Sequence, residues 1–155
     1  MQVLIQRSLK GVTNLNQVQK NLLYVLSLFK NGQPRTHIGY ISGIINSDGP
    51  DNIRTNLKIL RKHTLKIRTF SQFPVFSPTD VFPPHIYLKL DEVKNLDVSR
   101  REQKFNFFWE RVLESELITH IFMTPRWELS KGARNEHQVA SKLGLEIQYT
   151  EQFIR

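Results

Sequence analysis

The sequence predicts an α/β fold in which a parallel sheet of about four to five strands is flanked by helices. Short apolar runs alternate with amphipathic helical stretches along residues 37–149. Strands that are separated by helices form βαβ units, in which the strands are parallel and the crossovers are right-handed. The chain has 155 residues, of which 39% are hydrophobic and 23% are charged. It is therefore long enough, and apolar enough, to bury one core.

Residues 1–36 are predicted to form an N-terminal helical extension. An apolar stripe with helical spacing predicts a helix there, and it consists of Val18, Leu22, Val25, Leu26 and Phe29. Gly32 and Pro34 follow the stripe and are typical of a helix end. Val3 and Ile5 suggest a short strand before this helix.

Residues 37–155 are predicted to form the α/β domain. The patterns predict strands at residues 37–44, 73–77, 118–123 and 146–149, and helices at residues 51–66, 105–117 and 131–143. Residues 81–104 contain two adjacent prolines and mixed charges, so we expect a long loop there with a short helix near Asp91. A long loop in a compact domain is often a lid or a binding loop.

Glu136 lies on the apolar side of the predicted helix 131–143. The inward stripe of this helix would consist of Ala133, Ala140 and Leu143, and Glu136 falls on it. A carboxylate on an apolar stripe is a local conflict that often marks function. The helix N-terminus would favour its charged form, so Glu136 is a candidate nucleophile. The alternative is a glutamate that only caps the helix or interacts with its dipole.

Three polar segments follow predicted strands. They are Ser42-Gly43, Pro78-Thr79-Asp80, and the stretch from Pro125 to Glu136. In parallel α/β sheets, ligands bind at the carboxyl ends of the strands. We therefore expect the three segments to converge at one edge of the sheet.

The chain is basic, with a formal net charge of +8, and six basic residues lie between Arg54 and Arg68. Such an excess attracts nucleic acid or an acidic partner. The alternative is a solvated helix face, because an opposite apolar stripe is present in Ile53, Leu57, Leu60 and Ile67. The pattern favours the solvated face over nucleic-acid binding.

Other classes of function find little support in the sequence. No cysteine is present, which excludes disulfides and thiolate chemistry and fits a cytoplasmic location. The five histidines lack ligand spacing, so we expect neither a metal site nor a cofactor. No apolar run reaches transmembrane length, and no secretory signal is expected, so no membrane partner is predicted.

Several motifs in this order resemble the nucleoside 2-deoxyribosyltransferase-like superfamily, and most closely a small uncharacterised-domain branch of it. They are Tyr40-Ile41-Ser42-Gly43, Pro125-Arg126-Trp127-Glu128, and Ser130-Lys131-Gly132-Ala133 with Glu136. The likeness covers roughly residues 37–149. It implies a flavodoxin-like fold and chemistry at the anomeric carbon of a deoxyribose.

The resemblance implies a role for each matching residue. Glu136 would attack the anomeric carbon and form a covalent glycosyl-enzyme, which another base or water then resolves. Tyr40, Ser42 and Gly43 would contact sugar or phosphate. Ser130 and Gly132 would hold a phosphate at the helix N-terminus, which favours a nucleotide over a free nucleoside. Trp127 would either stack on a nucleobase or pack beneath its loop.

The sequence also departs from the pattern of that superfamily. The usual aspartates of the preceding helix and strand are replaced by Arg111 and Thr119. Asp80 is a candidate for the missing acid, although a turn residue after Pro78 is an equally good interpretation. The alternative function is therefore a catalytically degenerate module that binds or senses a nucleotide.

The aromatic residues of the predicted helix 105–117 indicate that the protein forms a homo-oligomer. Adjacent helical residues diverge by about 100°. Phe108 and Trp109 can pack on the sheet, which leaves Phe107 pointing elsewhere. Exposed aromatic side chains often mark interfaces. We expect a homo-oligomer, unless the N-terminal helix covers Phe107.

Overall fold

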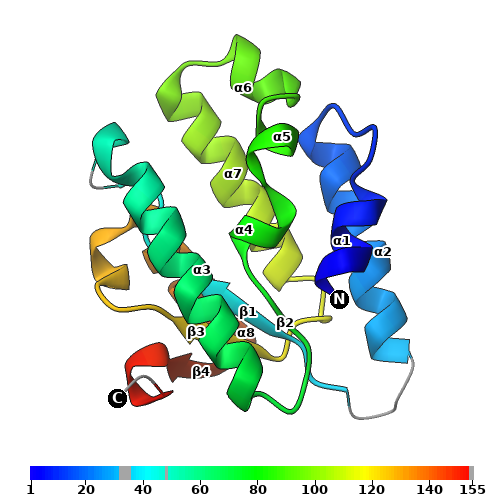
Figure 1. Ribbon diagram of the computed structural model, residues 1–155, viewed down its shortest axis with the longest axis vertical. Helices are drawn as coiled ribbons and strands as arrows, with labels where there is room; N and C mark the ends of the chain where they lie inside the picture. The colour runs from blue at the N-terminus through cyan, green and yellow to red at the C-terminus, as the bar shows by residue number, and fades with distance from the viewer. Residues whose placement is uncertain (32–35, 48, 154–155) are drawn as a thin grey trace.

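The computed structural model describes residues 1–31, 36–47 and 49–153, and it confirms the α/β architecture. Figure 1 shows the arrangement of its elements. The helices are α1 (Gln2–Ser8), α2 (Leu15–Asn31), η1 (Pro50–Asn52), α3 (Ile53–Phe70), α4 (Pro78–Val81), α5 (Pro84–Tyr87), α6 (Asp91–Asn95), α7 (Val98–Leu113), η2 (Trp127–Leu129), α8 (Lys131–Leu143) and η3 (Thr150–Phe153). The strands are β1 (Gly39–Ser42), β2 (Val75–Phe76), β3 (His120–Met123) and β4 (Glu146–Tyr149).

The four strands form one parallel sheet in the order β2-β1-β3-β4. This order is consistent with a flavodoxin-like fold. The chain moves from β1 to β2 on one side and from β3 to β4 on the other. Right-handed crossovers then place the connecting helices α3 and α8 on opposite faces of the sheet. The switch of direction lies between β1 and β3, where ligands of such sheets bind.

The two faces of the sheet have separate cores. Residues alternate between the faces of a strand, so Tyr40 and Ser42 lie on one face and Ile41 on the other. On the Ile41 side, the core contains α3 side chains and consists of Ile41, Leu60, Ile67, Val75 and Phe122. On the Tyr40 side, a larger core gathers side chains from α1, α2, α7 and α8.

Helices α1 and α2 pack into the larger core. Ile5 and Leu9 of the α1 region, and Leu22 and Leu26 of α2, are fully buried in the same cluster as Tyr40. Figure 1 shows α1 and α2 side by side. Val3 and Ile5, which suggested a short strand, lie in α1 instead. The predicted helix end at Gly32 and Pro34 lies outside the described residues.

The segment 81–104 corrects the prediction of a long loop. It contains α5, the expected short helix α6 near Asp91, and the first turns of α7. Val81, Ile86 and Leu90 are buried in the larger core, and these contacts hold the short helices in place. No helix in the described ranges is both long enough and apolar enough to cross a membrane.

Candidate functional site

Helix α8 carries Glu136 on its inward face, as predicted. The helix begins after Ser130, whose side chain accepts a hydrogen bond from the Ala133 amide at 3.2 Å. It ends at Gly144, which adopts the left-handed conformation with φ 69°. Ala133, Glu136 and Ala140 are buried.

Leu143 was expected on the inward face of α8, and this expectation is wrong. Leu143 is 45% exposed, while Val139 is buried. Leu143 is the last residue of α8, just before the turn at Gly144 towards β4, so it lies at the end of the packed face.

The Glu136 carboxylate meets Ser42 at the carboxyl end of β1. The Ser42 hydroxyl donates a hydrogen bond of 2.5 Å to Glu136 Oε2. Glu136 is only 7% exposed. Burial raises the pKa of Glu136 to about 7, although interactions with Ser42 and Tyr40 act in the opposite direction. Near neutral pH this carboxyl therefore exists in both its protonated and its ionised form.

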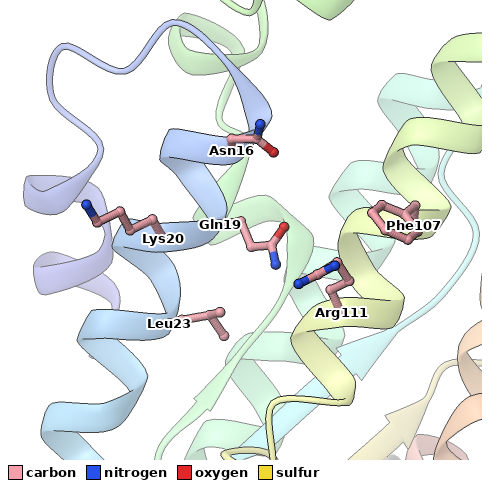
Figure 2. A pocket seen from close by; sticks show the side chains of 6 residues that line it. All are labelled: Asn16, Gln19, Lys20, Leu23, Phe107 and Arg111. Carbon is pink, nitrogen blue, oxygen red and sulfur yellow. The ribbon is translucent and has the colours of Figure 1, made fainter.

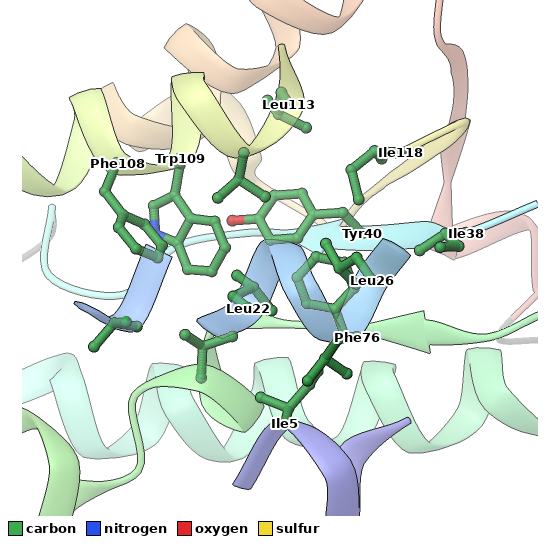
Figure 3. Packing of buried hydrophobic residues seen from close by; sticks show 14 of the residues in the cluster. Ile5, Leu22, Leu26, Ile38, Tyr40, Phe76, Phe108, Trp109, Leu113 and Ile118 are labelled. Atoms are coloured by element: carbon green, nitrogen blue, oxygen red, sulfur yellow. The ribbon is translucent and has the colours of Figure 1, made fainter. Parts of the chain in front are cut away.

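Tyr40 lies beside this carboxyl and is fully buried. Its ring packs against Trp109 at a centroid distance of 4.8 Å and against Phe76 at 5.4 Å. Figure 3 shows the Tyr40 hydroxyl directed towards Trp109. Burial and the neighbouring Glu136 raise the pKa of Tyr40 well above its ordinary value. Its hydroxyl makes no well-formed hydrogen bond to any described residue. It is nevertheless close enough to Glu136 for each group to shift the pKa of the other.

Gly43 lets the chain segments after β1 and β3 approach each other. The Thr124 amide donates to the Ser42 carbonyl at 2.9 Å. A Cβ atom on Gly43 would lie 2.1 Å from Thr124 Oγ1, which no packed structure tolerates. Thr124 was not predicted as a site residue. Its position directly after β3, at the same edge as Ser42, is the signal that points to it.

The N-terminus of α8 lies beside the loop that follows β1. The hydroxyls of Ser47 and Ser130 are 3.2 Å apart. Gly132 lies in the first turn of α8, where a Cβ would meet Asn106 Oδ1 of α7 at 3.2 Å. The predicted segments at Ser42 and at Ser130 to Glu136 thus converge. Ser47 was not singled out, although it belongs to the loop that follows the first strand.

Comparison with known protein families finds one match for this part of the chain. Residues 104–149 match the domain of unknown function DUF4406. The match begins within α7 and ends with β4, and it includes Glu136, Ser130 and Trp127. Tyr40, Ser42 and Asp80 lie outside it. Comparisons with curated proteins and with solved structures gave no significant match.

Within the DUF4406 segment, Trp127 stacks on a side chain of α8. Its ring lies nearly parallel to that of His137, with the centroids 4.3 Å apart. His137 Nε2 is also 3.2 Å from the Tyr149 hydroxyl of β4. Trp127 therefore has an aromatic partner in the protein itself, on α8.

Asp80 is held at the β2 side of the sheet, with partners other than Glu136. Its Oδ2 atom accepts hydrogen bonds from Arg68 Nη2 at 2.6 Å and from the Ser77 amide at 2.9 Å. The second bond belongs to a capping box at the start of α4. Asp80 is 2% exposed. These contacts account for a buried aspartate without a catalytic role.

The arrangement brings a buried carboxyl, a serine hydroxyl and a helix N-terminus to one edge of the sheet. An ionised Glu136 can act as a nucleophile, and its neutral form can donate a proton. The amides at the start of α8 can bind an anion. Among the described residues, no group of three His, Cys, Asp or Glu side chains is arranged to hold a metal ion.

Two surface cavities lie between α2 and α7, away from Glu136. Figure 2 shows the first, which is lined by Asn16, Gln19, Lys20, Leu23, Phe107 and Arg111. Phe107 also lines the second cavity and is 57% exposed. The guanidinium of Arg111 lies 5.5 Å from the centre of its ring. Helix α2 therefore packs beside Phe107 but leaves it accessible.

Proposed function

We propose that this protein cleaves the bond between base and sugar of a nucleotide-like substrate, with Glu136 as the nucleophile. The observation that carries the proposal is the buried Glu136 carboxyl, hydrogen-bonded to Ser42 at the switch point of a parallel sheet. The resemblance of the flanking motifs to the nucleoside 2-deoxyribosyltransferase-like superfamily supports the same reaction. The DUF4406 match carries no assigned activity.

In the proposed first step, a Glu136 oxygen bonds to the anomeric carbon while the bond from that carbon to the base nitrogen breaks. The electron pair leaves with the base, which takes a proton from water. In the second step, water attacks the same carbon, frees the carboxylate and releases a proton. A second base in place of water gives transfer instead of hydrolysis. Ser42 orients the reacting carboxylate throughout.

A phosphate of the substrate is assigned to the N-terminus of α8. Ser130 caps the Ala133 amide, and the other amides of the first helical turn favour an anion, where Gly132 leaves the backbone open. Ser130 and Ser47 contribute hydroxyls from two chain segments that meet there. Gly43 lies on the sugar side of the same edge. Tyr40, expected to contact sugar or phosphate, is fully buried and would act only through its neighbour Glu136.

The test is release of free base from a panel of deoxynucleosides and their monophosphates, followed by chromatography. We expect release by the wild type and a loss of at least about a hundredfold in Glu136→Gln, because an amide is no nucleophile. Glu128→Gln, an exposed glutamate of η2, is the matched control and should remain active. Absence of release from every substrate, with Glu136→Gln indistinguishable from wild type, would contradict the proposal.

The second candidate function is nucleotide binding without cleavage. The observation that favours it is the position of Asp80, which is paired with Arg68 and leaves no aspartate in contact with Glu136 among the residues that the structure describes. A thermal-shift screen separates the two functions. A nucleotide that stabilises the protein and remains intact after long incubation supports binding alone, and turnover of that nucleotide rules it out.

A further inference from the structure

The outer side of α3 carries a concentration of positive charge that the proposed reaction does not use. Five side chains form this cationic face, namely Arg54, Lys58, Arg61, Lys62 and Lys66. Four of them are exposed and Lys66 is half-buried. Successive members are three, four or one residue apart, so they lie on one side of the helix. The face extends about 18 Å along the helix axis.

Most of the net charge of the chain resides on this helix. The chain has 22 basic and 14 acidic residues, and six of the basic residues belong to α3, which has no acidic one. The remaining 16 basic residues nearly balance the 14 acidic ones. Helix α3 therefore carries six of the eight net positive charges.

The cations of this face lack anionic partners in the described part of the chain. The sixth basic residue of α3, Arg68, pairs with Asp80, but the five of the cationic face form no ion pair within residues 1–31, 36–47 and 49–153. Glu151 of η3 lies close enough to influence the pKa of His63, yet it pairs with no lysine of α3. The face is thus free to meet an external anion.

The sequence pattern favoured a solvated face, but like charges that are closely spaced and have no ion-pair partner among the described residues count against it. Lys58 lies four residues from both Arg54 and Lys62, and Lys62 lies four from Lys66. Like charges at this spacing destabilise a helix. A face that only needs water would alternate the two signs of charge. A polyanion that binds across the cationic face would offset the repulsion between these side chains.

The fold leaves the outer side of α3 open. Helix α3 packs its apolar stripe, which includes Leu60 and Ile67, on one face of the sheet. The helices α1, α2, α7 and α8 belong to the core of the other face. Figure 1 shows α3 lying across the sheet with no helix in front of it.

We infer that the cationic face of α3 binds the phosphate backbone of a nucleic acid. Along the axis of a duplex, each strand carries one phosphate about every 3.4 Å, so the length of the face corresponds to about five phosphates of one strand. An anionic membrane fits less well. Interfacial helices insert a continuous apolar face, whereas that face of α3 is buried against the sheet. The exposed apolar residues Ile59, Leu65 and Phe70 are separated from one another along the helix.

The test measures binding of fluorescein-labelled single-stranded and duplex oligonucleotides by fluorescence anisotropy at low salt. The variant Lys58→Glu/Arg61→Glu/Lys62→Glu reverses the centre of the face. The matched control, Lys10→Glu/Lys89→Glu/Lys94→Glu, makes the same change of net charge at exposed lysines outside α3. Circular dichroism confirms that both variants fold. None of these residues belongs to the Glu136 site.

We expect wild type and control to bind within about threefold of each other, and the α3 variant to bind at least about tenfold more weakly. The slope of log K against log salt should become shallower by about 0.9 for each duplex phosphate that the variant no longer neutralises. Absence of saturable binding to either oligonucleotide would overturn the inference. So would an equally weakened control, or binding to phosphatidylserine vesicles alone. Base release by Glu136 is independent of all these outcomes.

Discussion

At the scale of single residues, the main feature of the candidate site is the poor solvation of the Glu136 carboxyl. A carboxyl that is 7% exposed loses most of its hydration, and one hydroxyl hydrogen bond from Ser42 replaces it only in part. The result is a group that can change its protonation near neutral pH. Groups with strongly shifted pKa values concentrate at functional sites. Such groups often make the folded protein less stable than a neutral side chain at the same position would.

The first prediction follows from this shift. The pKa of Glu136 is raised from 4.5 to about 7 in the folded protein. Between these two pH values the folded protein therefore binds a proton that the unfolded chain has released. The free energy of unfolding should therefore fall as pH rises from about 4.5 through about 7, by about 3 kcal/mol in total. Glu136→Gln cannot ionise and should lack this component.

Urea unfolding at about pH 5 and about pH 8 measures this difference. The stability gained by Glu136→Gln over wild type should grow with pH, while Glu128→Gln should show no such trend. A constant difference between Glu136→Gln and wild type across this range would contradict a raised pKa.

The second prediction concerns Asp80, for which the sequence left two interpretations open. If Asp80 serves only the ion pair with Arg68 and the α4 capping box, Asp80→Asn should cost about 3 kcal/mol in stability, because Arg68 loses its partner. Base release measured well below the unfolding temperature should then persist. Loss of base release in a folded Asp80→Asn variant would instead make Asp80 the missing acid.

At the scale of elements, local signals predicted some bounds well. The strand β4 and the helix α8 were predicted with the bounds that the structure has. For α8, the cap residue Ser130 and the terminal Gly144 mark both ends in the sequence. For residues 81–104 the short helix near Asp91 was predicted and is α6, but the long loop was wrong. The helix α5 was missed because a helix of four residues is too short to show a period. Pro78 and Pro84, each at a helix start, are the local signal that was available.

The site was predictable to the extent that it follows from strand ends and helix periodicity. Those two rules identified Glu136 and Ser42, which are 94 residues apart in the chain. They could not identify which hydroxyls meet at the loops, because the contact of Ser47 with Ser130 depends on loop conformation. Asp80 followed the strand-end rule as well, but its partner Arg68 comes from the far end of α3. Pairing across elements is what sequence periodicity leaves open.

The third prediction concerns the junction of β1 and β3. Gly43→Ala should destabilise the protein by about 1–3 kcal/mol, because its Cβ would collide with Thr124 Oγ1. It should also reduce base release, since the collision displaces the end of β1 that carries Ser42. Thr124→Ala removes the colliding atom. The double variant Gly43→Ala/Thr124→Ala should therefore recover stability relative to the sum of the single variants, as a double-mutant cycle measures.

At the scale of the whole molecule, the N-terminal helices complete the larger core. Ile5 and Leu9, with Leu22 and Leu26, are fully buried against the cluster that holds Tyr40 and Trp109. The Tyr40 ring packs against Trp109 and also lies beside Glu136. Helices α1 and α2, which were predicted as an extension, thus pack against the core that contains Tyr40 and Trp109.

The fourth prediction is that residues 37–155 do not fold alone. Removal of residues 1–36 would expose the Tyr40 side of the sheet and take away several fully buried aliphatic side chains, each worth about 1.5–3 kcal/mol of burial. This loss approaches the whole stability of a typical domain. Dispersed amide proton signals from the truncated chain, equal to those of the full chain, would show that the extension is dispensable.

The fifth prediction concerns assembly through α7. Phe107 is 57% exposed beside α2, so the described residues do not cover it. We expect a homo-oligomer whose interface includes this ring, since buried aromatic side chains contribute strongly to association. Light scattering at micromolar concentration should give a mass above that of the 18.3 kDa monomer. Phe107→Ser should weaken association by at least about tenfold, while Val98→Ser, at an exposed apolar residue of the same helix, should not. A monomer mass for the wild type would refute this prediction and leave Phe107 free for a different partner.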